Sequence, residues 1–214
     1  LYPNVADRVK GAKLDTEHKK DYLTTKQVAR LLGAIDRSTK KGLRDYAMLS
    51  VMVTTGLREI SIVRADIGDI RTAGDAVALF YQGKGHEEKA DYVKLAEPVE
   101  EAVRAYLKAR GGADPKAPLF SSIANRNNGE RMTTRSVSRV AKERLIAVGL
   151  ESDRLTGHSM RHTAATLNLL NGGTVEETRQ LLGHTNINTT LIYSHALERA
   201  KNNSEERIAK AIFG

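Results

Sequence analysis

The sequence predicts a mainly α-helical protein with one small antiparallel β-sheet, which is an α+β fold. In most segments apolar residues recur at helical spacing, whereas between residues 76 and 95 they follow the shorter period of β-strands. The 214 residues are also enough to bury a sizeable core. We therefore expect one main domain.

The first two helices are predicted from their start and stop signals. Thr24-Thr25-Lys26-Gln27 has the pattern of a capping box, in which side chains satisfy the first backbone N–H groups of a helix. The helix that follows carries four apolar residues on one face, namely Val28, Leu31, Leu32 and Ile35. A second helix is expected over residues 43–55, and Gly56 should end it.

The sheet is predicted from three short segments. Residues 77–81 and 92–95 have the composition of strands, and Gly83-Lys84-Gly85 lies in the loop that joins them. A short strand near residues 67–71 should complete the sheet, because an isolated hairpin is only marginally stable in water.

Helical patterns return after the sheet. Helices are expected over residues 99–110, 133–148, 158–171, 174–182 and 187–194, with a second capping box at Thr174–Glu177. A final helix near residues 205–213 carries Ile208, Ala211 and Ile212. This apolar face packs either against its own domain or against a neighbouring protomer.

Charge and composition limit the classes of function. Lysine and arginine total 34 against 26 acidic residues, and the net charge of +8 favours a polyanionic partner such as nucleic acid or an anionic membrane surface. Charged residues interrupt every apolar stretch, so we expect a soluble, cytoplasmic protein without a membrane span. The chain has no cysteine, which excludes thiolate catalysis and disulfides. His158 and His162 are four residues apart, but no third ligand is apparent, and no metal is expected.

Four short motifs follow one another along the chain. They are Thr55-Gly56-Leu57-Arg58-Glu59, Gln82-Gly83-Lys84-Gly85-His86, His158-Ser159-Met160-Arg161-His162, and Leu182-Gly183-His184-Thr185 followed by Tyr193. Each motif alone is a weak signal. Together, in this order and with predicted strands around Lys84, they resemble the tyrosine recombinase (phage integrase) family, over residues 24–193. The resemblance implies the tyrosine recombinase catalytic-domain fold.

The resemblance implies a catalytic role for six residues, which are Arg58, Lys84, His158, Arg161, His184 and Tyr193. The two arginines correspond to those that hold the scissile phosphate, and guanidinium groups suit this task because they offer paired N–H donors to anionic oxygens. The later histidine, His184, would add a further donor. No metal ion or other cofactor is implied.

The remaining roles concern proton transfer. Tyr193 corresponds to the nucleophile, and since a free tyrosine has a pKa of about 10 it needs a base or a strongly positive pocket to react. The resemblance assigns assistance with deprotonation to His158. Lys84 would protonate the departing 5′ oxygen. The product would be a 3′-phosphotyrosyl link and a free 5′ hydroxyl.

One position departs from the family pattern. The family often carries an acidic residue three positions after the first arginine, and this chain has Ser61 there. We expect the support of Arg58 to come instead from Glu59 or Asp66.

The implied function is site-specific DNA recombination, as the integrase of a mobile genetic element or in the resolution of chromosome dimers. A type IB topoisomerase, which relaxes supercoils with a similar pocket, is one alternative. A non-catalytic DNA-binding protein that grips the duplex through Arg135, Arg139 and Lys142 is another. The expected partners are double-stranded DNA and, in a homotetramer on paired sites, other copies of the chain. The resemblance also leaves room for an accessory directionality factor.

The same resemblance divides the chain into three parts. Residues 1–22 are polar and charged, and we interpret them as the remnant of an interdomain linker or as a disordered tail. Residues 23–200 form the expected catalytic domain, and residues 201–214 form the C-terminal helix, for which docking in trans and packing in cis are the two alternatives. The chain begins with Leu1-Tyr2-Pro3, with neither a methionine nor a secretory signal, and the family's N-terminal core-binding domain is expected to precede it in a longer protein.

Overall fold

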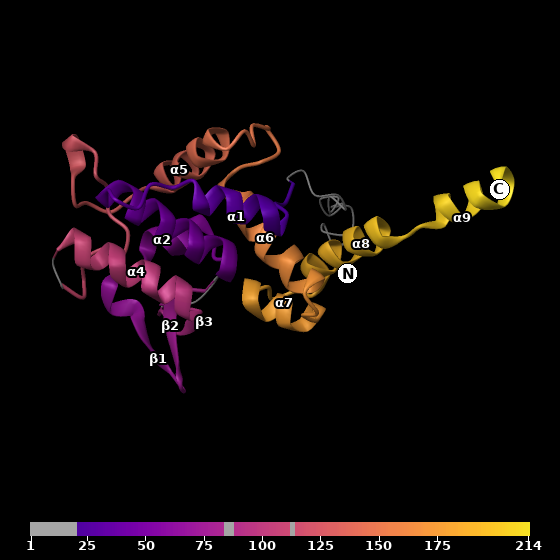
Figure 1. Cartoon of the computed structure of the whole chain (residues 1–214). Helices are drawn as coiled ribbons and strands as arrows, with labels where there is room; N and C mark the ends of the chain where they lie inside the picture. The colour runs from indigo at the N-terminus through magenta and orange to yellow at the C-terminus, as the bar shows by residue number, and fades with distance from the viewer. Residues whose placement is uncertain (1–20, 84–87, 112–113) are drawn as a thin grey trace, which may run out of the picture.

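The computed structural model describes residues 21–83, 88–111 and 114–214 (Figure 1). Most of the predicted linker, residues 1–20, lies outside the described residues. The end of the predicted linker contacts the main body, because Asp21 forms an ion pair with Arg154 at 2.8 Å. None of the helices in the described ranges is long and apolar enough to cross a membrane.

The first two helices begin at side-chain caps. Helix α1 spans Thr25–Gly33, and Thr24 and Gln27 form the predicted capping box. Helix α2 spans Lys40–Thr55 and starts three residues before the prediction, because the Thr39 hydroxyl accepts a hydrogen bond from the Gly42 N–H at 3.0 Å. Gly56 ends α2 as predicted, with a φ of 65°.

A three-stranded antiparallel sheet follows in the order β1-β2-β3. It consists of β1 (Ile70–Ala73), β2 (Ala76–Tyr81) and β3 (Asp91–Lys94), and it packs near α4 (Figure 1). The predicted first strand, near residues 67–71, is present, but it begins three residues later, at Ile70, and ends two residues later, at Ala73. Residues Ile67–Asp69 instead form a 3-10 turn, in which the Asp69 carboxylate accepts a hydrogen bond from the Asp66 N–H at 2.7 Å.

The other regular elements of the described chain are helices, which confirms a mainly α protein with a small antiparallel sheet. The remaining helices are α3 (Glu59–Arg64), α4 (Glu97–Arg110), α5 (Thr134–Ala147), α6 (Gly157–Leu170), α7 (Val175–Leu182), α8 (Asn188–Lys201) and α9 (Ser204–Phe213). The prediction missed α3, and it ended α8 seven residues too early, at residue 194 instead of Lys201. The capping box at Thr174 is confirmed.

Helix α2 forms the centre of the body and packs against α4 and α6. A buried charge cluster ties it to α5. The carboxylate of Asp45, which is 1% exposed, accepts hydrogen bonds from Arg44 at 2.6 Å and from Arg144 on α5 at 2.5 Å. A buried charge is tolerated only when it has partners. The bonds of Asp45 therefore fix the position of α5 relative to α2.

The last helix does not pack against the body. Helix α9 extends away from it at the C-terminal end (Figure 1), and Ile208, Ile212 and Phe213 are 58%, 66% and 87% exposed. Among the described residues, α9 therefore has no packing partner in cis. Docking in trans stays a prediction.

Candidate active site

Arg161 lies at the junction of three helices. It occupies the second turn of α6, is 4% exposed, and donates from Nη1 to the Gly56 carbonyl at 2.6 Å and from Nη2 to the Leu182 carbonyl at 2.7 Å. These carbonyls belong to the ends of α2 and α7. A guanidinium has five N–H donors, so three of the five face no partner among the described residues.

Arg58 brings a second positive charge close to the first. It is the partly buried residue that precedes α3, and its guanidinium makes no hydrogen bond to any described residue. Burial, and then the like charge of Arg58, lower the pKa of Arg161 to about 10. Arg161 is therefore still charged at neutral pH. Two adjacent guanidiniums with unused donors form a site for an anion.

Two glycines allow this close approach. Gly56 and Gly183 both have positive φ, 65° and 59°, and they end α2 and α7. A Cβ atom on Gly56 would lie 2.6 Å from Leu182 and 3.2 Å from Ala164, so any side chain here would force these neighbours to shift, in addition to straining the positive φ. The backbone turn at Gly183 carries the chain directly into His184.

His184 is a neutral ring held beside the arginines. It is 8% exposed, and burial followed by the charges of Arg161 and Arg58 lowers its pKa to about 4. Its Nδ1 lies 2.9 Å from the Thr190 hydroxyl. When that hydroxyl donates to Nδ1, the ring proton is on Nε2, and His184 offers one N–H donor.

Tyr193 on α8 faces the same pair of charges. It is 5% exposed and packs in a small cluster with Ala165 and Leu182. Burial raises the pKa of Tyr193, and the charges of Arg161 and Arg58 lower it by a smaller amount. The phenol is therefore protonated at neutral pH, and a phenolate would form next to two cations.

The other predicted residues are placed differently. His158 is exposed at the start of α6, and its ring lies 4.9 Å from that of His162. Lys84 lies outside the described residues and stays a prediction, although β2 ends three positions before it at Tyr81. The structure thus brings together four of the six predicted residues, namely Arg58, Arg161, His184 and Tyr193.

The sequence reasoning missed two residues of this pocket. His162 was considered only as a metal ligand, yet its ring lies 5.4 Å from that of Tyr193 and also contacts His158. Tyr81 was assigned only to a strand, yet Arg58 and Arg161 both act on its phenol. The alternation of β2, which buries Leu79 and Tyr81 on one face, was the signal that could have placed Tyr81 inside.

The expected acidic support of Arg58 is wrong. Glu59 accepts a hydrogen bond from the Ser138 hydroxyl of α5 at 2.7 Å. Asp66 binds Lys89 at 2.7 Å and also binds Arg131. Neither carboxylate hydrogen-bonds to Arg58, because each is engaged by another part of the fold. Glu59 therefore fixes α3 against α5.

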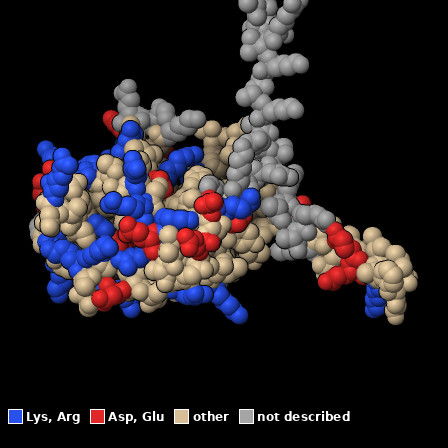
Figure 2. All heavy atoms as spheres, turned by 90° about the horizontal axis from the view of Figure 1, so that it is seen from above, with Lys and Arg blue, Asp and Glu red and all other residues tan. Residues whose placement is uncertain are grey.

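The three residues predicted to bind DNA line one hollow. It has a volume of about 580 Å³ and lies between α5 and the start of α6, with Arg135, Arg139, Lys142 and several hydroxyl groups along it. Lys and Arg side chains cover much of the body seen from above (Figure 2). The ammonium of Lys142 donates to the Ser152 carbonyl at 2.6 Å, so part of its donor capacity holds a loop. DNA contact by these residues stays a prediction.

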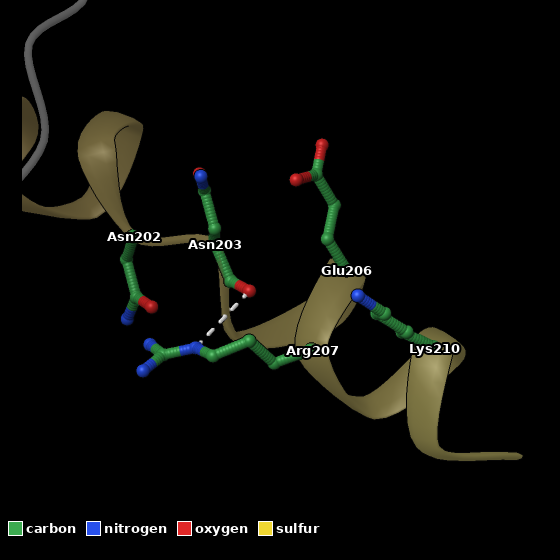
Figure 3. Close-up of a pocket in the computed structure, with 5 residues that line it drawn as sticks. All are labelled: Asn202, Asn203, Glu206, Arg207 and Lys210. Carbon is green, nitrogen blue, oxygen red and sulfur yellow. Dashed lines mark hydrogen bonds between the residues drawn. The ribbon is translucent and has the colours of Figure 1, made fainter. Parts of the chain in front are cut away.

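A second hollow, of about 480 Å³, lies at the C-terminal end of the chain. It is lined by Asn202, Asn203, Glu206, Arg207 and Lys210 around the junction of α8 and α9 (Figure 3). Arg207 donates to the Asn203 carbonyl at 3.4 Å within it. None of the residues of the arginine pocket lines this hollow, so we assign it no part in that site.

Comparisons of the sequence and of the structure with known proteins point to the same family. The model of the phage integrase family matches residues 21–199. The tyrosine recombinase XerC of Caldanaerobacter subterraneus subsp. tengcongensis is 33% identical over 195 residues, which are 90% of this chain and 52% of that protein. The chain thus spans about half the length of the curated relatives it matches.

Solved structures share the fold. The XerH site-specific recombinase in a post-cleavage complex with its palindromic difH substrate superposes with a TM-score of 0.69 at 21% identity, covering 90% of this chain and 52% of that one. The Tn1549 transposon integrase in complex with circular intermediate DNA superposes with a TM-score of 0.66 at 24% identity, covering 84% of this chain and 63% of that one.

Proposed function

This chain belongs to the phage integrase family, and on that premise we propose that it breaks and rejoins DNA at defined sites through a 3′-phosphotyrosyl intermediate. The observation that carries the proposal is the convergence of Tyr193 with Arg58 and Arg161 in one pocket. A protonated phenol beside two cations and a neutral imidazole suits attack on a phosphodiester.

The arginines bind the scissile phosphate in this proposal. Arg161 is fixed by the Gly56 and Leu182 carbonyls, so its remaining N–H groups are oriented before the substrate arrives. Arg58 donates to the same non-bridging oxygens. His184 adds its Nε2 proton while Thr190 holds the other ring nitrogen. The charge that develops in the transition state is thereby shared among three donors.

Tyr193 forms the covalent bond to DNA in this proposal. Its oxygen forms a bond to phosphorus as the bond from phosphorus to the 5′ oxygen breaks. His158 assists the removal of the phenolic proton, and the ring of His162 contacts those of both His158 and Tyr193. Lys84 protonates the departing 5′ oxygen. A 5′ hydroxyl of another strand then reverses the step, which conserves the number of phosphodiester bonds.

The double-stranded DNA partner also needs contacts away from the scissile phosphate. We propose that Arg135 and Arg139, both exposed on α5, bind the phosphate backbone along the hollow described above. Lys142 contributes less, because its ammonium holds the loop that follows α5.

Two biological settings fit this chemistry. Integration of a mobile genetic element is our first proposal, and the structural similarity to a transposon integrase is in keeping with it. Resolution of chromosome dimers is the second candidate, which the similarity to XerC favours. Sequencing the DNA junctions that the protein makes separates the two, because they differ in whether the joined sites come from an element and its target or from two chromosome copies.

The test of the proposed function is covalent capture on a suicide substrate, a duplex nicked close to the cleavage point so that the 5′ hydroxyl fragment diffuses away. We expect a protein–DNA adduct that survives denaturant, and peptide mapping should place the nucleotide on Tyr193. Absence of an adduct on DNA that the protein binds would favour the non-catalytic alternative. Recombinant joints from paired sites support a recombinase, whereas relaxed circles alone would indicate a topoisomerase.

Assembly into a tetramer should depend on α9. Deleting residues 202–214 removes the exposed apolar face of Ile208, Ile212 and Phe213, which we propose docks into a neighbouring protomer. We expect cooperative assembly on paired sites to be lost in gel-shift titrations, while binding of one protomer to a half-site is retained.

The matched control for this deletion is the full-length double variant Ile208→Ser and Ile212→Ser, which keeps the helix and removes its apolar face. It should lose assembly to a similar degree. Unchanged tetramer assembly in both proteins would show that α9 does not connect the protomers.

A further inference from the structure

A second tyrosine reaches the arginine pocket from the sheet. Tyr81 is the last residue of β2, is 7% exposed, and has its ring in the main hydrophobic core. Its hydroxyl oxygen lies 3.0 Å from the position that a Cβ atom on Gly183 would occupy. The hydroxyl therefore lies against the turn that connects α7 to His184.

The surroundings of the hydroxyl keep it protonated, so it can act as a hydrogen-bond donor. Burial raises the pKa of Tyr81, and so does Asp91, which lies directly opposite on β3. The charges of Arg161 and Arg58 lower this pKa by a smaller amount. The phenol keeps its proton at neutral pH. It can therefore donate a hydrogen bond to an anion, and it is poorly suited to act as a nucleophile.

Nothing in the described part of the chain accepts this proton. The hydrogen bonds of the described residues include none from the Tyr81 hydroxyl, whereas the comparable buried hydroxyl of Tyr106 lies 3.1 Å from Ser121 Oγ. A buried phenolic hydroxyl normally has a partner, because leaving it without one costs about 1–3 kcal/mol. Next to two guanidiniums, the acceptor best suited to such a donor is an anionic oxygen of a ligand.

We propose that the Tyr81 hydroxyl donates a hydrogen bond to the scissile phosphate, as a further catalytic residue beside Arg58, Arg161 and His184. The inference rests on the proposed function, since that function supplies the phosphate. Three observations carry it: the buried ring fixed in the core, the hydroxyl placed at the Gly183 turn, and the shared electrostatic environment of the two arginines. Tyr81 would stabilise charge on a non-bridging oxygen without forming a covalent bond.

The substitution Tyr81→Phe tests the hydroxyl alone, because the ring and its core contacts remain. We expect single-turnover cleavage of the suicide substrate to slow by about 10²-fold, the usual cost of removing one preorganised donor. DNA affinity should stay near that of the unmodified protein, and the midpoint of thermal unfolding should not fall, because the lost hydroxyl has no partner among the described residues. Tyr92→Phe is the matched control, because Tyr92 lies on β3 and is 49% exposed. This variant should cleave at the normal rate.

A sulfur substitution distinguishes contact with the phosphate from a structural role. Replacing one non-bridging oxygen of the scissile phosphate by sulfur weakens hydrogen bonds to that position. With one of the two diastereomers, we expect cleavage by the unmodified protein to slow more than cleavage by Tyr81→Phe, because the variant has already lost the donor. Equal slowing of both proteins with both diastereomers would overturn the proposal, as would a normal cleavage rate for Tyr81→Phe on ordinary DNA.

The same experiment separates this inference from the proposed function. If the unmodified protein forms no covalent adduct, the function itself fails. If it forms the adduct and Tyr81→Phe does so at the same rate, the function stands and only the role of Tyr81 is removed.

Discussion

Replacing Tyr193 by phenylalanine should abolish the covalent adduct with DNA while leaving the fold and the DNA affinity intact. The ring of Tyr193 is 5% exposed and packs with Ala165 and Leu182, and phenylalanine preserves those contacts. Only the attacking oxygen is lost. Loss of a nucleophile lowers turnover by on the order of 10⁴-fold or more, so the adduct should fall below detection on denaturing gels.

A tyrosine outside the pocket provides the control for this result. Tyr92→Phe removes a hydroxyl from the exposed side of β3 and should leave the adduct unchanged. Should Tyr193→Phe still be trapped on DNA, the nucleophile assignment would be wrong. Peptide mapping would then have to examine Tyr81 first, because it is the other phenol on which both arginines act.

Local signals in the sequence were enough to predict most helices. The capping boxes at Thr24 and Thr174 and the glycine that ends α2 act over four or five residues, and each is found where it was expected. Helix α3 escaped prediction because its six residues are too few to display a period. The first strand was misplaced because a side chain of Asp69 turned the preceding residues into a 3-10 turn, which composition alone does not reveal.

The candidate site was less accessible from sequence, for a physical reason. The resemblance named Arg58, Arg161, His184 and Tyr193, but their convergence depends on contacts between residues far apart in the chain. Arg161 reaches back 105 positions to the Gly56 carbonyl. Such contacts have no local signature, and the same holds for Tyr81.

The acidic partner of Arg58 illustrates the same limit. Proximity in sequence suggested Glu59, but its carboxylate points toward Ser138 on α5, and Asp66 is held by Lys89 and Arg131. A carboxylate forms its bonds with whichever donors the tertiary fold brings within reach. Sequence distance from Arg58 was therefore a poor guide to which residue supports it.

The substitution Arg161→Lys should slow cleavage by about 10²- to 10³-fold although it conserves the charge. Lysine has one ammonium group and lacks the planar arrangement of donors. It cannot bind the Gly56 and Leu182 carbonyls at the sites of the two Nη atoms and also present paired donors to a phosphate. Single-turnover cleavage of the suicide substrate measures the loss, and Arg104→Lys on the exposed surface of α4 is the matched control.

Stability should change in the same variant, and this separates the two roles of Arg161. If either buried carbonyl loses its donor, we expect the free energy of unfolding to fall by about 1–3 kcal/mol in denaturant titrations. Cleavage is therefore measured well below the melting temperature of the variant. A protein that is destabilised but cleaves at the normal rate would show that Arg161 only joins α2, α6 and α7, and that Arg58 binds the phosphate without it.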